Sequence, residues 1–398
     1  MSVLRNIEVS KKYNVNPTTV TNWINQSLKG KVNLDLAKIS DRYYIKDNYS
    51  NHNELAKLKD VGVKYRASTK VTRVKPSKKI YQLFTSDQLI DIIVNMQTFG
   101  YIPMKYLYFG TGAIVYEKMY QDSLLEKNTW PNSELELIAS NVGFVTQKLK
   151  SYDSINLIDI GSTTGLPAKS VLLGLKQTGQ LGDYSTIDSG CELFKICKQN
   201  VKQWLNIDAQ YIQADFENSF IRSEIFLSSK NRESSNLLLF MGNRISGFRN
   251  RNLAFSHIAK SMNKNDFLWM GLAMASSPQH LDKTYIQGGS DLNKFSESII
   301  ELLNLTDHVF ISDFEFDVQS KTFKKYFTPK NEIEIEFEIN GQTAIVTLDK
   351  DRDVDVFVDY KYDLPEITQD ILDQELAIDY FCCNSDSGYG LFLVRPKS

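Results

Sequence analysis

The feature that most constrains the fold is an alternation of short apolar runs and amphipathic segments between residues 157 and 272. The apolar runs are expected as buried strands over residues 157–160, 184–187, 210–213, 237–241 and 267–272. The segments between them are expected as helices over residues 166–178, 190–205 and 250–262. Strands connected through helices run parallel, and such a sheet is covered on both faces. The pattern therefore predicts an α/β fold with a doubly wound, Rossmann-like sheet.

A glycine-containing turn follows the first of these strands, with the sequence Asp159-Ile160-Gly161-Ser162-Thr163-Thr164-Gly165. Gly161 and Gly165, with Ser162 between them, let the backbone approach a ligand closely. The helix behind the turn offers free N–H groups and the positive end of its dipole. The spacing is not Gly-x-Gly-x-x-Gly, and no Lys-Ser or Lys-Thr pair follows. The first departure argues against a dinucleotide site, and the second argues against a triphosphate site of the P-loop kind.

Acidic residues stand at the ends of the next two strands. Asp188 lies about 27 residues beyond Gly161, and a carboxylate there can accept hydrogen bonds from both hydroxyls of a ribose. Asp215 can accept from an adenine amino group, while Phe216 packs on the ring. Together with the turn, these residues predict S-adenosylmethionine (SAM) as the cofactor. The alternative is an unrelated α/β fold in which they are ordinary turn glycines and Asp caps.

The rest of this body carries weaker patterns. Helices are expected over residues 86–98, 112–124, 133–150 and 366–377, and a last strand over 390–394. Residues 332–339 alternate glutamate with apolar side chains, and Asn340-Gly341 is a hairpin signal before residues 343–348. An antiparallel insertion is therefore expected. We assign residues 81–134 and 276–365 to an α+β substrate lobe, and residues 135–275 and 366–398 to the cofactor-binding core.

The first 50 residues have the pattern of a small helical domain. Asn16 is a good N-cap, and Pro17 suits the first position of a helix over residues 17–26. The apolar side chains of that helix fall on one face: Val20, Trp23 and Ile24. A shorter helix over residues 7–13 precedes it, and residues 42–45 suit a small wing. This arrangement resembles a helix-turn-helix of the excisionase/MerR sort, followed by a basic linker over residues 51–80 with one helix over 53–59.

Charge is divided unevenly along the chain. Residues 1–80 hold 17 basic and 6 acidic side chains, whereas the remainder holds 29 basic and 42 acidic ones. A basic head on an acidic body suggests two modules with different partners. We predict that the head binds DNA, with contacts to bases and phosphates from Thr18, Thr19, Thr21, Asn22, Lys11 and Lys12. The alternative is that the head serves protein contacts or dimerisation instead of DNA binding. An oligomeric protein is compatible with either interpretation.

Composition narrows the remaining classes. The four cysteines form no CxxC pair, which indicates buried thiols in a reducing compartment, and we expect a cytoplasmic protein. The four histidines are scattered, so no metal site is expected. No apolar run approaches the roughly 18 residues of a membrane span.

The body, over about residues 81–398, resembles the histidine Nα-methyltransferase family of ergothioneine biosynthesis, whose members use SAM. The resemblance is carried in order by residues 108–117, 130–134, 157–169, 214–216 with 240–242, and 361–364. It implies cofactor contacts at Tyr108, Gly161, Lys169, Asp188, Asp215 and Phe216. It also implies that Tyr285 faces the substrate. Trp130 and Phe357 would join Tyr108 and Tyr285 in an aromatic wall, which suits a sulfonium cation.

Three positions depart from that family's pattern. An Ile-Gly-Asn stretch of the family reads Ile245-Ser246-Gly247 here, so Gly247 replaces an asparagine that holds the amino acid. The substrate-binding Glu and Ser of the family align with Phe357 and Asp359. A site built for polar contacts rejects a mismatched ligand strongly. The resemblance with these departures implies an acceptor other than histidine, or loss of catalysis.

Asp359 has two interpretations. It can bind an acceptor ammonium or act as a base. The preferred interpretation is a solvated residue, because it follows an acidic run over residues 349–355. No catalytic residue stands out, since positioning alone supplies much of the rate of methyl transfer.

The leading functional prediction is a SAM-dependent methyltransferase acting on nitrogen of a small amino-acid-like or amine acceptor. The alternative is a DNA-binding regulator whose body senses SAM or a related metabolite. A third option is a methyltransferase for a macromolecule, anchored to nucleic acid by its head.

Overall fold

The chain is described by a computed structural model that covers residues 3–4, 6–13, 15–39, 42–66, 71–125, 129–222, 225, 235–274, 289–384 and 388–397. It divides into two compact units. The first, here called the head, comprises Met1–Arg73 with Asn331–Glu334 and Thr347–Lys350. The second, here called the body, comprises Val74–Lys330, Ile335–Val346 and Asp351–Ser398.

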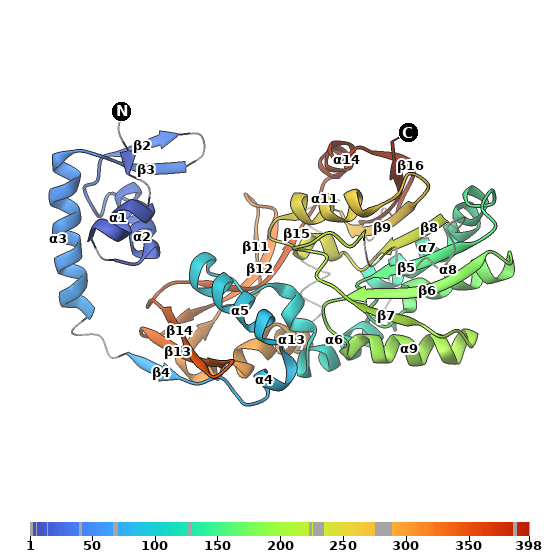
Figure 1. Ribbon diagram of the computed structural model, residues 1–398, viewed down its shortest axis with the longest axis horizontal. Coiled ribbons are helices and arrows are strands. Elements are labelled where there is room, and N and C mark those ends of the chain that lie inside the picture. The colour runs from blue at the N-terminus through green and yellow to red at the C-terminus, as the bar shows by residue number, and fades with distance from the viewer. Residues whose placement is uncertain are drawn as a thin grey trace. The chain divides into compact units, whose positions relative to one another are not determined.

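A seven-stranded sheet organises the body, in the order β16-β17-β9-β8-β5-β6-β7 (Figure 1). Five of its strands are parallel: β5 (Ile155–Ile160), β6 (Leu181–Asp188), β7 (Gln210–Gln213), β8 (Ser235–Phe240) and β9 (Phe267–Ala273). Strand β17 (Tyr389–Pro396) pairs antiparallel with β9 and with β16 (Leu376–Asn384). The predicted doubly wound sheet is confirmed, with its ligand-bearing edge at the carboxyl ends of the parallel strands.

Helices cover both faces of this sheet, because side chains of each strand alternate between two cores. Ile158 and Ile160 of β5 belong to one core, which includes side chains of α11 (Arg251–Ser261) and α14 (Leu364–Asp373). Ile155 and Leu157 of the same strand belong to the other core. That core packs against α7 (Trp130–Lys148), α8 (Leu166–Gln177) and α9 (Glu192–Leu205).

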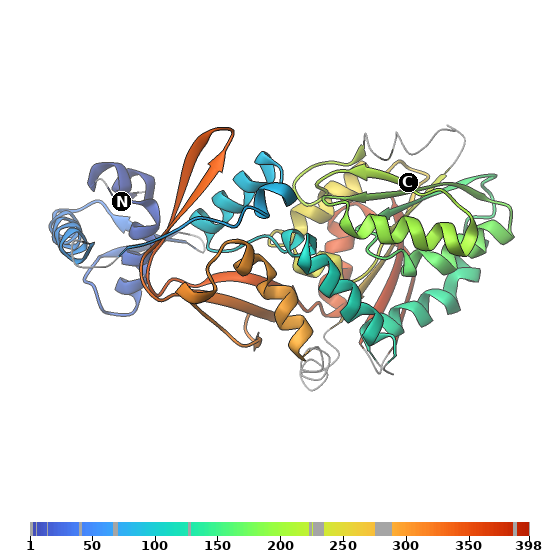
Figure 2. The same cartoon turned by 90° about the horizontal axis from the view of Figure 1, so that it is seen from below.

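The segments assigned to the substrate lobe form helices and antiparallel strands. Its helices are α4 (Ile80–Leu83), α5 (Ser86–Val94), η1 (Asn95–Phe99), η2 (Met104–Tyr108), α6 (Thr111–Ser123), α13 (Gly289–Leu302) and η4 (Thr306–His308). One sheet consists of β10 (Val309–Ile311), β11 (Glu315–Asp317), β12 (Thr322–Pro329) and β15 (Val354–Tyr360). Figure 2 shows these orange strands beside the seven-stranded sheet rather than within it.

The predicted hairpin is formed by β13 (Ile333–Ile339) and β14 (Gln342–Leu348), in a sheet ordered β14-β13-β4 with β4 (Thr72–Val74). Its alternation is confirmed, since Ile333, Ile335 and Phe337 are fully buried.

The C-terminal helix is shorter than predicted. Instead of running to residue 377, α14 ends at Asp373, and β16 begins at Leu376. The chain turns between them because Glu375 adopts a left-handed backbone with φ of 58°, which a helix cannot continue. The strand pattern of β16 is weak because most of its side chains are half-buried. The thiols also differ from the prediction, since Cys197 is buried but Cys383 is exposed.

The head contains α1 (Asn6–Tyr13), α2 (Pro17–Leu28), α3 (Tyr49–Arg66) and an antiparallel sheet β1-β3-β2 made of Val3–Leu4, Arg42–Lys46 and Leu36–Ile39. The predicted cap is confirmed, because the Asn16 side chain accepts from the Thr18 N–H at 2.9 Å. Val20, Trp23 and Ile24 are buried, as expected.

The basic linker predicted over residues 51–80 is wrong. Helix α3 occupies much of it, and Leu55 is fully buried in the core of the head. The helix is held at its start by Asn48, whose side-chain oxygen accepts from the Asn51 N–H at 2.8 Å. Its apolar side chains are sparse among polar ones, so the sequence pattern gave only a short helix.

No helix in the described part of the chain is long and apolar enough to cross a membrane.

Candidate active site

A cavity of about 360 Å³ opens at the carboxyl ends of the parallel strands, between the core and the substrate lobe. Strand ends β6, β7 and β8 contribute Asp188, Phe216 and the loop after Phe240. The lobe contributes side chains from η2, α6, α13 and β15. Parallel strands place their ends at one edge, which is why residues far apart in sequence meet here.

Predicted residues line this cavity from both sides. Of the residues predicted to bind the cofactor, Tyr108, Asp188 and Phe216 line it, and of those predicted to bind the acceptor, Gly247, Phe357 and Asp359 do so. Gly161 and Ser162 line a narrow recess beside the glycine turn, together with Glu134 and Asp159. The body therefore brings together most of the predicted site, as the spacing of strand ends suggests.

Three predicted residues lie elsewhere or are engaged differently. The ammonium of Lys169 lies over the Trp204 ring, 4.6 Å from its centroid, and Lys169 is not part of the lining formed by described residues. Asp215 also lies outside that lining, and it accepts from Lys105 at 2.6 Å and from Asn218 at 2.9 Å. Gly165 serves helix packing, because a Cβ there would lie 2.8 Å from the Cys197 sulfur.

Two predicted substrate residues cannot be placed. Tyr285 lies outside the described residues, and Trp130 begins α7 without a described side chain. The other two residues predicted for the aromatic wall, Tyr108 and Phe357, line the cavity. Tyr108 packs edge-on against Tyr116 and Phe295, with ring centroids 4.9 and 5.1 Å apart.

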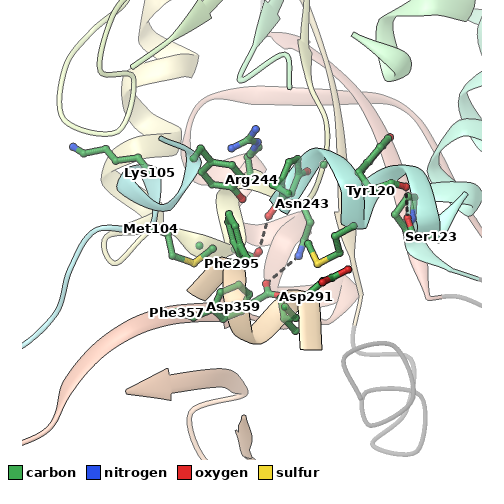
Figure 3. Close-up of a pocket in the computed structure, with 18 of the residues that line it drawn as sticks. Met104, Lys105, Tyr120, Ser123, Asn243, Arg244, Asp291, Phe295, Phe357 and Asp359 are labelled. Carbon is green, nitrogen blue, oxygen red and sulfur yellow. Dashed lines mark hydrogen bonds between the residues drawn. The ribbon is translucent and has the colours of Figure 1, made fainter. Parts of the chain in front are cut away.

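Asp359 is not a solvated residue. It is 3% exposed, and its carboxylate accepts from Asn243 and from Lys361, each at 2.9 Å. Figure 3 shows the Asn243 amide reaching Asp359 beside Phe357. Phe357 and Asp359 stand two residues apart on β15, so they share the face that lines the cavity.

Lys105 is the centre of an acidic cluster at one side of the cavity. It lies 2.9 Å from Asp91, 2.6 Å from Asp215 and 3.9 Å from Glu217. Burial works to lower the pKa of Lys105, but the carboxylates of Asp215 and Glu217 outweigh it and raise that pKa. Burial raises the pKa of Glu217 to about 7, despite the opposing effect of Lys105. Glu217 is thus a cavity carboxyl able to take up a proton near neutrality.

Arg244 is the most prominent residue that sequence reasoning missed. It lies in η3 (Arg244–Gly247), just beyond β8, and its guanidinium donates to the Gly161 carbonyl at 3.2 Å. The same group lies 4.4 Å from the centroid of the Tyr108 ring. The only sequence signal was its place in the loop after the fourth strand, two residues beyond Gly242.

Glu134 is the second missed residue. It is fully buried, and its Oε2 atom accepts from the Gly242 N–H at 2.7 Å and from the Tyr389 hydroxyl. Burial raises its pKa to about 7, although these hydrogen bonds work to lower it. Burial also raises the pKa of Asp188, against the effect of Arg244. The described residues contain no group of His, Cys, Asp and Glu side chains that could hold a metal ion.

Comparison with known proteins assigns the chain to a family. A family model described as "Histidine-specific methyltransferase, SAM-dependent" matches residues 86–396, well over half of the chain. The chain belongs to this family. Its cofactor is therefore SAM, and the suspected resemblance is confirmed for the body.

The other comparisons add little. No curated protein matches the chain. Among solved structures, a SAM-dependent methyltransferase from Clostridium acetobutylicum is 8% identical, with a TM-score of 0.38 over 66% of this chain and 92% of that one. The CcbJ methyltransferase from Streptomyces caelestis is 9% identical, with a TM-score of 0.34 over 61% and 84%. The CurJ carbon methyltransferase is 10% identical, with a TM-score of 0.42 over 100% and 82%. Similarity at this level supports no statement about function.

The residues present fit the cofactor. Phe216, Asp188 and Gly161 follow three adjacent strands, β7, β6 and β5, in the order required by adenine, ribose and the amino-acid end of SAM. At that last position the Oε1 atom of Glu134 is buried, and it has no hydrogen-bond partner among the described residues. A buried charged atom of this kind is costly unless a ligand satisfies it.

Proposed function

We propose that the protein transfers the methyl group of SAM to nitrogen of a small amine or amino-acid-like acceptor other than histidine. The observation that carries this proposal is Asp359, a buried carboxylate that faces the cavity beside Phe357. A carboxylate in that position suits an acceptor ammonium or amine. The adjacent Phe357 offers no hydrogen bond to an imidazole, and Gly247 offers no side-chain amide.

The cavity offers several carboxylates as contacts for a cationic acceptor. Among the described residues that line it, two side chains are basic and five are acidic: Lys105 and Arg244, and Asp122, Asp188, Glu217, Asp291 and Asp359. Lys118 pairs with Asp122 and Asp291, and Lys361 pairs with Asp359, so the lining has no large net negative charge, and an acceptor ammonium would bind through direct contact with a carboxylate. The rings of Tyr108 and Phe295 also line the cavity, and aromatic rings suit the sulfonium that the cofactor would bring.

The chain's own residues would then position and deprotonate the acceptor. SAM, when bound, supplies an electrophilic methyl group, and the acceptor nitrogen forms a bond to that carbon as the carbon–sulfur bond breaks. An ammonium must lose a proton before it can attack. Glu217 is suited to receive it, because burial raises its pKa to about 7 and it lines the same cavity. Asp359 would hold the acceptor in line with the methyl group, which supplies much of the rate.

The test is a turnover screen with SAM over histidine, other amino acids and simple amines, with S-adenosylhomocysteine and methylated products measured by mass spectrometry. Asp359→Asn should raise the KM for the acceptor while leaving SAM affinity within about twofold. Because removing one partner of a buried ion pair is destabilising, the double variant Asp359→Asn/Lys361→Met controls for the unpaired lysine. An unchanged acceptor KM in both variants would reject the role of Asp359.

DNA binding by the head is a separate proposal. The structure leaves Lys11, Lys12 and Thr21 exposed, while Thr18, Thr19 and Asn22 are half-buried. A DNA-binding regulator would bind DNA and SAM but would not transfer the methyl group. The turnover screen described above therefore separates the regulator from the enzyme.

A further inference from the structure

Two groups of opposite charge stand beside the glycine turn, the fully buried Glu134 and the half-buried Arg244, and each has a buried atom without a hydrogen-bond partner among the described residues. These atoms are Nε of Arg244 and Oε1 of Glu134. Both residues contact the loop after β8, since Glu134 of α7 accepts from the Gly242 N–H and Arg244 follows two residues later in that loop. A buried charged side chain with an unmet hydrogen bond is costly. Two such groups of opposite sign at one place point to a zwitterionic ligand.

Arg244 is placed to bind an anion at this turn. Its guanidinium contacts the Gly161 carbonyl, and a Cβ at Gly161 would lie 3.2 Å from Nε. The glycine therefore leaves room for the guanidinium. The helix that starts after Gly165 adds its positive dipole end to the same place. Lys169, which the family resemblance implies as a cofactor contact, is instead held over the Trp204 ring.

The order of strand ends identifies the ligand. Phe216 and Asp188 follow β7 and β6, which suits adenine and ribose. The next strand ends are β5 and β8, which carry Gly161 and the Arg244 loop. The part of SAM that continues from the ribose is its amino-acid end, with one carboxylate and one ammonium.

We propose that Arg244 binds the carboxylate of SAM and that Glu134 binds its ammonium. The proposal rests on the proposed function only in taking SAM as the ligand. In this proposal the positive charge that binds the carboxylate comes from Arg244 in the loop after β8, and not from Lys169 in helix α8. The proposal also makes Arg244 a specificity residue, since the guanidinium that now contacts the Gly161 carbonyl would turn to the ligand. An amino-acid acceptor has the same zwitterionic chemistry, and the experiment distinguishes the two sources.

The test is calorimetric binding of three ligands to the full-length chain: SAM, decarboxylated SAM and 5′-methylthioadenosine. The second lacks only the carboxylate, and the third lacks the whole amino-acid end. Wild type should bind SAM about tenfold or more tightly than decarboxylated SAM, as a charged hydrogen bond provides. In Arg244→Gln this ratio should fall close to one, with the affinity for methylthioadenosine unchanged within about twofold. Glu134→Gln should weaken SAM and decarboxylated SAM alike and leave methylthioadenosine unaffected.

Controls keep the outcomes separate. Arg249→Gln is a matched arginine variant, since Arg249 is half-exposed and pairs with Asp355 at 3.4 Å. It should retain the wild-type ratio. Arg244→Lys keeps a positive charge and serves as the second variant if Arg244→Gln folds poorly. Its ratio of SAM affinity to decarboxylated SAM affinity should lie between those of wild type and Arg244→Gln. A wild-type ratio in both Arg244 variants would overturn the proposal while leaving SAM binding intact. Lysine and cadaverine differ only in the carboxylate, so as acceptors they test whether Arg244 binds the acceptor carboxylate instead. The proposal would fall if the Arg244 variants no longer distinguished lysine from cadaverine but still distinguished SAM from decarboxylated SAM. Absence of SAM binding by wild type would instead reject the proposed function.

Discussion

Replacing Asp188 with alanine should weaken SAM binding by at least about a hundredfold. Asp188 lines the cavity at the end of β6, and its Oδ1 atom already accepts from the Ser189 N–H at 2.7 Å. The proposed ribose contact adds two hydrogen bonds from hydroxyls to a charged acceptor, each worth about 1.5–3 kcal/mol. Their loss costs at least about 3 kcal/mol, which corresponds to roughly 150-fold in affinity. Asp188→Asn keeps one acceptor atom for Ser189 and should fall between wild type and Asp188→Ala.

Isothermal titration calorimetry with SAM and with S-adenosylhomocysteine measures this directly. Both ligands contain the ribose, so both affinities should fall by the same factor. Asp208→Ala is the control, because that carboxylate is exposed and pairs with Lys202 at the surface. Circular dichroism checks that each variant is folded. Equal affinities for wild type and Asp188→Ala would refute the assignment of the ribose site.

Three further predictions concern stability and the head. Lys105→Met removes the ammonium that pairs with Asp91, Asp215 and Glu217, so the free energy of unfolding in urea should fall by about 1–3 kcal/mol. An unchanged midpoint would contradict a stabilising role for this cluster. Burial raises the pKa of Glu134 from 4.5 to about 7, so between these pH values the folded protein binds a proton that the unfolded chain has released. Stability should therefore decline as pH rises from about 5 to 7, and Glu134→Gln should flatten this decline in thermal melts. The head should be retained on a DNA column at low salt and released as salt increases, with earlier release for Lys11→Ala/Lys12→Ala; no retention at low salt would exclude the DNA-binding regulator.

Local patterns in the sequence predicted the parts of the fold that local forces decide. The cap at Asn16 and the apolar face of Val20, Trp23 and Ile24 depend only on neighbours within one helix. The alternation of strands and helices likewise defined the parallel sheet, because buried strands must be apolar. Helix α3 was underestimated because Leu55 packs into the core of the head from within a polar stretch. Its burial comes from tertiary contacts that no local pattern reveals.

The candidate site divides in the same way. Gly161, Asp188 and Phe216 were predictable because strand ends can be read from the sequence. Arg244 and Glu134 were not predictable, since they approach the turn only once β8 pairs with β5 and α7 packs on the sheet. Asp359 was misjudged as solvated for a related reason. Its acidic neighbours suggested a wet surface, but Asn243 and Lys361 supply buried partners for its carboxylate.

Competition between acceptors tests the central claim most directly. Wild-type protein would be given SAM with equimolar histidine and a panel of amino acids and amines, and each methylated product would be quantified. The account predicts N-methylation of an amine-bearing acceptor, with histidine poor because Gly247, Phe357 and Asp359 replace its polar contacts. Histidine as the best acceptor would contradict this interpretation of the three positions.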